Sequence, residues 1–380
     1  MALNAHDLDA MTAVAEVDLG ALVRNAARLQ AAAPSAQLLV AVKADAYGHG
    51  LVPVARALEA ANVAWFGVAT PQEALDLRAA GIRCRILIFG PQRGRPIEQL
   101  LDAEVDLTVT TLDDLEAVKA AVRGGPGRSA RVHLKVDTGM GRLGLPANAA
   151  LPVAHAAEQA ARIRLEGVWT HFARSDEPDA TTTDDQLEHF DAFLADLARH
   201  GLTPPLRHAA NSAALLTRPD THFDLVRPGI AAYGCPPVID DHGTARSLEP
   251  VLRVHAPVVF TKRVAAETPI SYGHRWRARR ETTIATVRFG YGDGYPRALT
   301  NLGDVDVGGR TCRVVGTVCM DQLMIDVGDE EVEVGERVTV LGAPGPSAND
   351  LANRIGSISY ELLTRLGARV TRRHRTTPSG

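Results

Sequence analysis

The sequence contains only 4 cysteines among 380 residues and no long hydrophobic run, and both absences exclude classes of protein. The cysteines lack the paired C-x-x-C spacing of a zinc site and show no secreted disulfide pattern; they are Cys84, Cys235, Cys312 and Cys319. We interpret them as small buried side chains in a reducing compartment. No segment is long enough to span a membrane. Met1–Met11 has no apolar core and is not a signal peptide, so a cytoplasmic protein is expected.

Aromatic residues and lysines are also scarce. Aromatic residues make up 4% of the chain and the formal net charge is −4, so nothing indicates a nucleic-acid surface. Arginine supplies most of the positive charge, and the lysines are Lys43, Lys119, Lys135 and Lys262. A lysine in a chemically suggestive position is therefore a functional candidate. With 46% hydrophobic residues the chain can bury a sizeable interior, and its length indicates two domains unless one is a barrel.

From residue 14 to about residue 234, short β-like runs alternate with helical patterns. The predicted strands are Gln37–Val42, Ala64–Val68, Arg85–Phe89, Asp106–Val109, Arg131–Val136, Leu165–Thr170, Leu206–His208 and Phe223–Val226. The predicted helices are Leu19–Ala32, Leu51–Ala60, Pro71–Ala80, Ile97–Ala103, Leu112–Arg123, Ala150–Arg162, Thr183–Arg199 and Ser212–Leu216. Asp18, Thr70 and Thr111 stand where helix caps are expected. Eight strands interleaved with helices predict an α/β fold with a (β/α)8 TIM-type barrel, while a doubly wound sheet usually has fewer strands.

The pattern changes after Gly234. Residues 235–250 are rich in proline, glycine and charge and are typical of a linker. Further strands are predicted at Leu252–Phe260, Thr283–Arg288, Asp304–Val307, Thr311–Val318, Gln322–Val327 and Arg337–Leu341, followed by a helix at Ser347–Ile355. We therefore expect a barrel over residues 14–245 and a smaller β-rich C-terminal domain over residues 246–380, with residues 1–13 as a candidate addition to the second domain.

Polar residues with chemical potential follow the predicted barrel strands. Lys43 follows the first strand, Arg142 the fifth, His171 the sixth, Asn211 and Ser212 the seventh, and residues 227–230 the eighth. In a (β/α)8 barrel the carboxyl ends of all strands lie on one face, where active sites are built. The sequence therefore predicts one site at that face.

Two features of this predicted site have ordinary structural explanations beside the functional ones. Lys43 closes an apolar strand and either simply extends to solvent or loses its charge by desolvation and reacts with an aldehyde cofactor. Ser212 starts a predicted helix, and Gly229 and Ile230 follow a proline. They are explained by capping and a turn, or by a phosphate bound between the ends of strands seven and eight. The adjoining Tyr47, in a glycine-rich loop, favours the ligand-binding explanation.

The longer motifs resemble those of the alanine racemase family. They are AVKADAYGHG around Lys43, KVDTGMGRLG from Lys135, the triplet around His171, Asn211-Ser212, DLVRPGIAAYG around Arg227, Ser271-Tyr272-Gly273, GYGDGY from Gly290, and VCMDQ around Met320. They occur in order from about Val14 to Val370, so the resemblance covers both expected domains.

This resemblance implies a pyridoxal 5'-phosphate-dependent racemisation of L-alanine and D-alanine that supplies D-alanine for peptidoglycan. Lys43 binds the cofactor covalently and moves a proton on one face of the substrate, and Tyr272 of the partner subunit does so on the other face. The C-terminal domain thus contributes the second catalytic base to a neighbouring chain, so a homodimer with composite sites is expected. No metal is implied.

The resemblance also assigns cofactor and substrate contacts. Arg227 contacts the pyridine nitrogen, and His171 orients Arg227. Arg142 contacts the phenolic oxygen and the substrate carboxylate, which the Met320 backbone amide shares. Cys319 and Asp321, beside Met320, are further substrate-binding candidates. The phosphate contacts are Tyr47, Ser212, Gly229, Ile230 and Tyr360, and Asn211 is a further cofactor-binding residue.

The remaining assignments concern access, modification and substrate. Asp176, Tyr291 and Arg297 resemble polar residues at the entrance of the site, and Lys135 resembles a lysine that becomes carbamylated beside Arg142. A racemase of another small amino acid, such as serine, and a non-catalytic pyridoxal phosphate carrier are the alternatives. The carrier resembles only the first domain, so the motifs of the second domain favour the racemase.

Overall fold

The computed structural model describes residues 12–179, 181–238 and 243–376. The chain divides into two compact units. The barrel unit comprises residues 22–46 and 51–249; the C-terminal unit comprises residues 250–380 with residues 47–50 and the chain up to Ala21. The predicted fold class, a TIM-type barrel with a second β-rich domain, is confirmed. Residues 1–11 of the candidate addition 1–13 lie outside the described residues.

The barrel unit is built from one parallel sheet of eight strands in the order β8-β7-β6-β5-β4-β3-β2-β9. The strands are β2 (Gln37–Ala41), β3 (Trp65–Val68), β4 (Arg85–Ile88), β5 (Asp106–Val109), β6 (Ala130–Lys135), β7 (Ile163–Trp169), β8 (Leu206–His208) and β9 (Leu225–Val226). Every predicted barrel strand is therefore present. Asp224 N donates to Arg207 O across the β8–β9 edge, at 3.0 Å, so the two end strands approach each other and nearly close the barrel.

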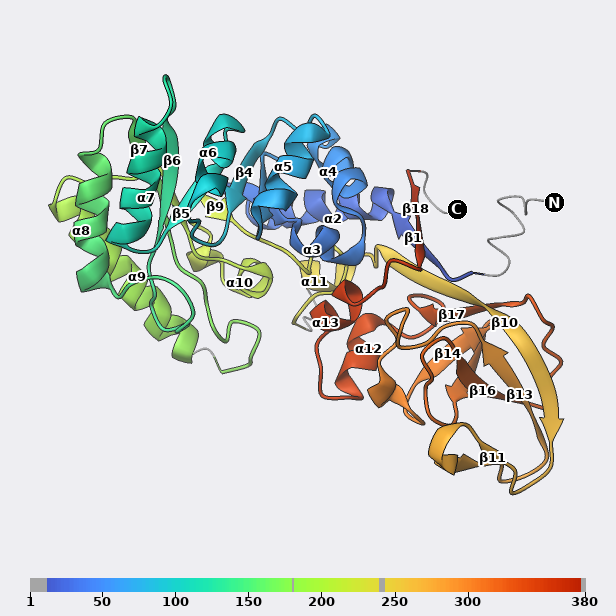
Figure 1. The fold of residues 1–380 in the computed structure, drawn as a ribbon. Coiled ribbons are helices and arrows are strands. Elements are labelled where there is room, and N and C mark those ends of the chain that lie inside the picture. Colours follow the sequence, from blue (N-terminus) through green and yellow to red (C-terminus); the bar gives the residue numbers. More distant parts are fainter. Residues whose placement is uncertain (1–11, 180, 239–242, 377–380) are drawn as a thin grey trace. The chain divides into compact units, whose positions relative to one another are not determined.

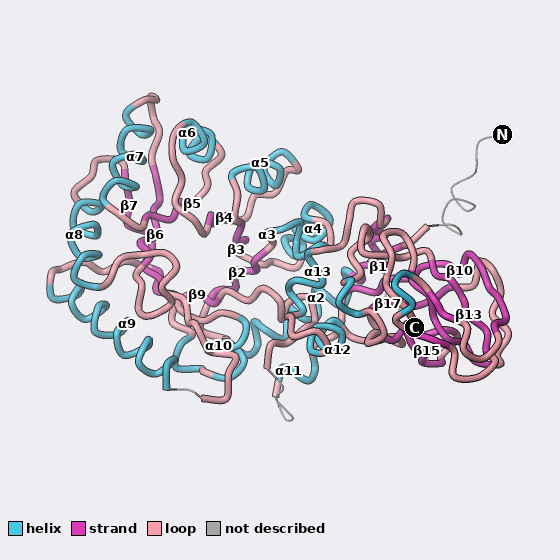
Figure 2. The backbone as a smooth tube through the Cα atoms, turned by 60° about the horizontal axis from the view of Figure 1, so that its bottom comes forward, coloured by secondary structure: helices cyan, strands magenta, loops and turns pink. Residues whose placement is uncertain are grey.

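Helices surround the barrel strands, and Figure 2 shows α5 to α9 outside them. The helices are α2 (Leu19–Ala32), α4 (Leu51–Ala60), α5 (Pro71–Ala79), α6 (Arg95–Asp102), α7 (Leu112–Arg123), α8 (Ala147–Glu158), α9 (Thr181–Arg199), α10 (Ser212–Thr217) and α11 (Thr244–Ser247). Thr70 and Thr111 form the capping boxes that the sequence predicts. Asp18 accepts a hydrogen bond from Ala21 N at 2.8 Å, which confirms it as a cap. Within the described residues, no helix combines the length and apolarity needed to cross a membrane.

The barrel core contains large apolar side chains from five of its strands, β2, β3, β4, β8 and β9. Leu39, Trp65, Leu87, Leu206 and Leu225 form one buried cluster. Each strand is short, but the strands contribute side chains to a shared interior, as in other closed parallel sheets. Burial of these side chains stabilises the barrel by the transfer of apolar surface out of water.

The C-terminal unit is a mixed sheet in the order β13-β16-β15-β14-β17-β10-β1-β18, in which β10 also pairs with β13. Its strands are β1 (Val14–Asp18), β10 (Leu252–Val264), β13 (Thr282–Val287), β14 (Asp304–Val307), β15 (Arg310–Val314), β16 (Leu323–Gly328), β17 (Arg337–Leu341) and β18 (Thr371–Arg375). Figure 1 shows β1 beside β18, although they come from opposite ends of the chain.

Two expectations for the chain ends were wrong. Residues from Val14 were assigned to the barrel, but β1 pairs antiparallel with β10 and parallel with β18. The domain was also expected to end in a single helix, whereas α12 (Ala348–Asn353) is followed by α13 (Ser359–Thr364) and β18. The charged residues of β1 (VAEVD) and β18 (TRRHR) hide their strand character, and the six-residue α13 is too short for a periodic pattern. The β11 (Pro269–Ile270) and β12 (Trp276–Arg277) hairpin is shorter still.

Truncating a core leucine is expected to destabilise the barrel unit much more than truncating an exposed one. Leu87→Ala leaves a cavity in the core cluster and should lower the free energy of unfolding by about 2–5 kcal/mol. The matched control is Leu112→Ala, whose side chain is 45% exposed and should change it by less than about 0.5 kcal/mol. Urea unfolding followed by circular dichroism measures both. Equal losses in the two variants would contradict this assignment of the core.

Candidate active site

The predicted functional residues of the barrel unit do follow its strands. Lys43 comes two residues after β2, His171 two residues after β7, Asn211 three after β8 and Arg227 directly after β9, while Arg142 lies in the loop after β6. Because the sheet is parallel, these positions lie at the carboxyl end of the barrel. The convergence that the sequence predicts is therefore present.

A left-handed turn directly follows Lys43. The segment α3 (Lys43–Gly48) has φ between 53° and 54° at four successive non-glycine residues, 44–47, and 81° at Gly48. Each non-glycine residue in this region costs roughly 1–2 kcal/mol. Gly48 tolerates no side chain, since a Cβ there would lie 2.2 Å from Leu363 O. A strained segment persists only where its surroundings over-determine it.

Two carboxylates hold this turn. Glu73, which also caps α5, accepts a hydrogen bond from Ala44 N at 2.7 Å. Asp45 accepts from Leu51 N at 2.8 Å. The same backbone also closes on itself, because Ala46 N donates to Val42 O at 2.8 Å. These contacts offset the strain and fix the backbone that carries Lys43.

Lys43 is a poorly solvated amine in a positive environment. Burial lowers the pKa of Lys43, the Arg142 charge lowers it further, and Glu73 opposes both. Its Nζ lies 5.8 Å from the centre of the Phe89 ring. A lysine with a lowered pKa keeps more of its amine uncharged, which is the form that attacks a carbonyl carbon.

Arg227 is buried at the barrel mouth and held there by several hydrogen bonds. Its guanidinium donates to Thr170 O at 2.7 Å, to Ala209 O at 2.9 Å and to His208 Nδ1 at 3.0 Å. His171 Nδ1 lies 3.4 Å away, which is consistent with the expected orienting role. Burial lowers the pKa of Arg227 to about 9. These contacts define the orientation of the guanidinium.

Lys135 and His171 share this positive field. Burial, together with the Arg227 and Arg142 charges, lowers the pKa of Lys135 to about 7. Its Nζ has no hydrogen-bond partner among the described residues and lies 4.1 Å from the Trp169 ring centre. Burial and the same cations hold the pKa of His171 well below its usual range. The site is thus built to receive negative charge.

The loop that carries Arg142 is organised by Asp137. The Asp137 carboxylate accepts hydrogen bonds from the backbone N–H groups of residues 139, 140 and 141, at 2.9–3.1 Å. Gly144, with φ of 103°, leaves no space for a side chain because a Cβ would lie 2.9 Å from Lys135 O. The glycines of this motif therefore serve the path of the loop.

Ser212 links the segments after β8 and β9. Asn211, not Ser212, caps α10, accepting from Ala214 N at 3.0 Å. The buried Ser212 Oγ instead accepts from Gly229 N at 2.9 Å and from Ala231 N at 3.3 Å. The structure therefore brings Ser212 together with Gly229 and Ile230, as the strand order predicts, and the ordinary capping explanation for Ser212 is wrong.

Asp176 is exposed on the loop that follows β7. With Ser175, Thr183 and Arg218 it lines a pocket of about 570 Å³ in the barrel unit. Ser175 Oγ donates to Asn211 Oδ1 at 2.9 Å, which ties this loop to the start of α10. Asp176 thus stands beside residues that follow β8, consistent with an entrance position.

In the C-terminal unit, Tyr272 projects from a constrained turn. Its side chain is 74% exposed and begins the short helix η2 (Tyr272–His274). Ser271 and Gly273, on either side, have φ of 66° and 71°. Ser271 Oγ donates to Thr317 O at 2.6 Å, and Thr317 Oγ1 donates to Tyr272 O at 2.7 Å. An exposed tyrosine on a fixed backbone suits insertion into another surface.

Met320 lies on a neighbouring loop of the same unit. Its carbonyl accepts from Gly292 N at 2.8 Å, and a Cβ at Gly290 would lie 2.3 Å from that oxygen. Cys319 Sγ lies 3.5 Å from Ser271 Oγ. Asp321 pairs with Arg369 at 2.7 Å. The structure therefore brings Cys319 together with the turn of Tyr272, whereas Asp321 is engaged by an arginine.

The other predicted residues of this unit are spread over several elements. Tyr47 and Tyr360, the latter on α13, have ring centres 6.1 Å apart, and burial raises the pKa of Tyr47. Tyr291 is 43% exposed, and its N–H donates to Cys319 O at 3.0 Å. Arg297 begins the short helix η3 (Arg297–Leu299) and is exposed. Tyr47 and Tyr360 thus form one cluster, and Tyr291 adjoins the Met320 loop.

Sequence reasoning missed three residues that shape the site. His208 contacts Arg227, Trp169 lies beneath Arg227 and Lys135, and Glu73 holds the turn after Lys43. His208 ends a predicted strand and Trp169 is the next-to-last residue of another, and these positions were the available signal. Glu73 gave only a capping signal, which did not reveal its second role.

Comparison with known proteins now decides the family. The N-terminal domain of alanine racemases matches residues 17–237, and the C-terminal domain of alanine racemases matches residues 251–374. The chain belongs to the alanine racemase family. This confirms the resemblance that the motifs indicate and places the chain among isomerases.

Relatives of this family align along nearly the whole chain. The alanine racemase of Thermobifida fusca is 46% identical over 95% of this chain and 97% of its own length. The crystal structure of alanine racemase from D-cycloserine-producing Streptomyces lavendulae is 41% identical, with a TM-score of 0.92, and covers 97% of this chain and 98% of its own. The Bartonella henselae alanine racemase, with covalently bound pyridoxal phosphate, is 28% identical with a TM-score of 0.87 and covers 96% and 99%.

The lowered pKa of Lys135 has a consequence for stability. Between about pH 7 and pH 10.5 the unfolded state holds this proton and the folded state does not, so the free energy of unfolding rises with pH. Relative to Lys135→Met, the wild-type protein should gain about 1 kcal/mol per pH unit in this window. Urea unfolding of both proteins in CO2-free buffer at several pH values measures the difference. A difference independent of pH contradicts the lowered pKa.

Proposed function

We propose that this chain is a pyridoxal 5'-phosphate-dependent alanine racemase that interconverts L-alanine and D-alanine and supplies D-alanine for peptidoglycan. It acts as a homodimer with composite sites. The observation that carries the proposal is the poorly solvated Lys43, held by a strained turn beside the cations of the barrel mouth. Family membership adds the reaction, since the named relatives are alanine racemases.

The residues present fit pyridoxal phosphate. The barrel mouth offers an amine for the aldehyde, and cationic groups for the ring oxygen and the substrate carboxylate. The hydrogen-bonded pair Ser212 and Gly229 offers a position for a phosphate. Burial lowers the pKa values of Lys43 and Lys135, and the positive field that lowers them further is the complement of such an anion. Tyr47, Ile230 and Tyr360 would complete the phosphate contacts, and Asn211 would be a further cofactor contact.

When bound, the cofactor withdraws electrons from Cα of the amino acid and makes its proton acidic. Inversion then requires that a proton leave one face of Cα and return on the other. Lys43 Nζ would move the proton on one face, and Tyr272 Oη of the partner subunit on the opposite face. The 74% exposure of Tyr272 supports this, because a side chain that serves a neighbouring chain must project from its own.

Arg227 would contact the ring nitrogen of the cofactor. Arginine only donates hydrogen bonds and stays charged, so it disfavours a proton on that nitrogen. Electron withdrawal is then weaker than with a carboxylate partner, which limits side reactions. His171, 3.4 Å from the Arg227 guanidinium, would help to orient it.

Arg142 would bind the phenolic oxygen and the substrate carboxylate, which the Met320 amide shares. Cys319 and Asp321, on either side of Met320, would be further substrate contacts, but the Asp321 side chain would not bind that carboxylate because it is negative and pairs with Arg369. The Lys135 amine is the group that carbamylation would convert from a buried cation into an anion beside Arg142. Its pKa of about 7 makes it nucleophilic enough to react with CO2 at neutral pH. Asp176, Tyr291 and Arg297 would restrict the entrance to small amino acids.

Complementation between inactive variants tests the composite site. Lys43→Ala and Tyr272→Phe should each abolish racemisation of both alanine enantiomers. After the two proteins are mixed and reassorted, about half of the dimers are hybrids with one complete site of two, so about a quarter of wild-type activity should return. Polarimetry with alanine, and with serine as a second substrate, measures the rates. No recovery on confirmed reassortment contradicts the partner-subunit tyrosine, and faster turnover of serine contradicts alanine as the substrate.

Replacing Arg227 tests the argument on electron withdrawal. Arg227→Glu should favour protonation of the ring nitrogen and raise pyruvate formation relative to racemisation by about tenfold or more. Arg227→Lys keeps a donor and a positive charge and is the matched control, with a ratio near wild type. A coupled pyruvate assay measures both. An unchanged ratio of pyruvate formation to racemisation in Arg227→Glu would contradict this role of Arg227.

A further inference from the structure

A chain of buried polar side chains leads from Arg227 down through the barrel interior. Arg227 Nη1 lies 3.0 Å from His208 Nδ1, and His208 Nε2 lies 3.0 Å from His133 Nδ1. His133 Nε2 lies 3.3 Å from Asp106 Oδ2. His208, His133 and Asp106 are all 0% exposed. The chain therefore connects the barrel mouth to the first residue of β5, at the opposite end of the strands.

The surroundings of the two histidine rings fix their positions. The Trp169 ring stacks on His208 with centres 5.6 Å apart, and the Trp65 ring meets His133 edge-on at 5.7 Å. Gly167 makes room for His133, because a Cβ at that glycine would lie 2.4 Å from His133 Nδ1. Neither ring can turn without displacing a tryptophan or a strand.

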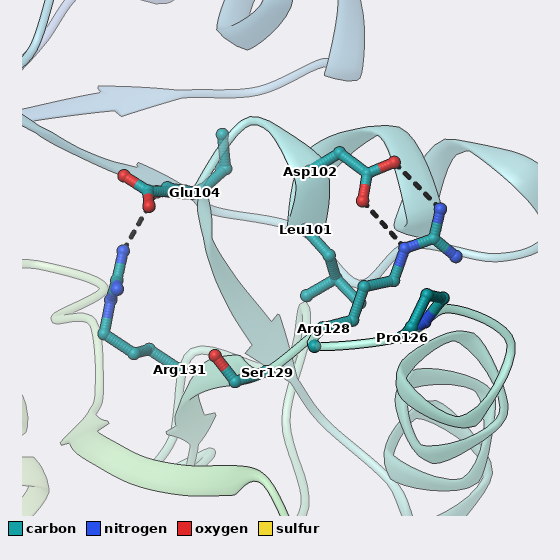
Figure 3. Close-up of a pocket in the computed structure, with 9 residues that line it drawn as sticks. Leu101, Asp102, Glu104, Pro126, Arg128, Ser129 and Arg131 are labelled. Atoms are coloured by element: carbon teal, nitrogen blue, oxygen red, sulfur yellow. Dashed lines mark hydrogen bonds and ion pairs between the residues drawn. The ribbon is translucent and has the colours of Figure 1, made fainter.

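The lower end of the chain is a carboxylate with several donors. Asp106 accepts from Arg131 Nε at 2.6 Å and from an Arg85 nitrogen, as well as facing His133. Arg131 also donates to Glu104 O at 2.9 Å (Figure 3). Burial alone raises the pKa of Asp106, but the His133 hydrogen bond and the two arginine charges outweigh burial and lower it. Asp106 is thus ionised and can only accept.

The donor and acceptor capacities of these side chains then fix the position of every proton in this series of hydrogen bonds. Arginine has no acceptor, so His208 Nδ1 must accept from Arg227 and His208 must carry its proton on Nε2. That proton is donated to His133 Nδ1, so His133 carries its own proton on Nε2 and donates it to Asp106. A charged His133 would donate to His208 Nε2 and force a proton onto His208 Nδ1, against the Arg227 N–H. Burial and the Arg227 charge also hold the pKa of His208 well below its usual range.

We infer that Asp106 and His133 are positioning residues, which through His208 set the hydrogen-bond polarity and orientation of Arg227. Their role in catalysis rests on the proposed function, in which Arg227 contacts the cofactor ring. The tautomers follow from the geometry alone. Without the chain, His208 could present an N–H to Arg227, and the guanidinium would lose its hydrogen bond to that ring.

Nitrogen-15 NMR of the imidazole rings in the full-length wild-type protein tests the tautomers. At neutral pH each ring should carry a proton on Nε2 and none on Nδ1, as the donor and acceptor geometry requires. Spectra of His133→Gln assign the signals by difference. A proton on Nδ1 of either ring would overturn the inference. Because the NMR measurement does not require racemase activity, its result does not depend on the proposed function.

Three variants test the positioning role. His133→Leu breaks the chain, whereas in His133→Gln the amide oxygen can accept from His208 and the amide nitrogen can donate to Asp106. Racemase kcat should be about tenfold lower in His133→Leu than in His133→Gln, the size expected for one hydrogen bond to a charged group. Asp106→Asn, whose amide cannot accept on both sides, should also lose about tenfold in kcat with the KM for alanine nearly unchanged.

Thermal unfolding of each variant shows whether it is folded, which separates a positioning role from a general loss of structure. His133→Leu and His133→Gln both remove the same ring, so a purely structural role predicts equal kcat values. Equal kcat values in folded proteins would therefore overturn the inference, as would a wild-type kcat in Asp106→Asn. If neither variant has racemase activity because the proposed function is wrong, the wild-type NMR result still decides the tautomers.

Discussion

The barrel mouth concentrates positive charge in a place with little water. Lys135 and Arg227 are buried side by side above the same tryptophan, and the charge of Arg142 acts on Lys135 as well. Such an arrangement is costly unless negative charge arrives, because each ammonium or guanidinium loses hydration and repels its neighbours. The lowered pKa values of Lys43, Lys135, Arg227 and His171 are different expressions of this one constraint. An anionic ligand would relieve it, so affinity for the ligand and reactivity of the amine have a common origin.

The rest of the site keeps these cations in place while their repulsion is uncompensated. Glu73 and Asp45 hold the left-handed turn that carries Lys43, and Asp137 gathers the loop of Arg142. Arg227 is fixed by two backbone carbonyls and by a histidine. The acidic groups therefore act on the backbone or at a distance from the cations. Direct neutralisation by a neighbouring carboxylate would remove the field that recruits the ligand.

Sequence patterns were informative where short apolar runs alternate with helical patterns or where residues occupy strand ends. All eight barrel strands and the capping residues Thr70 and Thr111 were predicted, because alternation and capping are local signals. The strand ends placed Lys43, His171 and Arg227 on one face without any knowledge of a family. The left-handed turn at residues 44–47 was missed because it contains no glycine. Asp106 and His133 were missed because polar residues within strands give no sign of their partners, which come from distant strands.

The pairing of β1 with both β10 and β18 has a consequence for how the protein is made. β1 is synthesised before the barrel unit, and its partners β10 and β18 are synthesised after it. The barrel unit can assemble while synthesis continues, but β1 has no partner strand until β10 has emerged, and its second edge stays open until about residue 375 has emerged. An exposed strand edge of this kind is prone to join other chains. The C-terminal sheet is therefore expected to be the slowest part of the molecule to mature in the cell and the part most dependent on protection during translation.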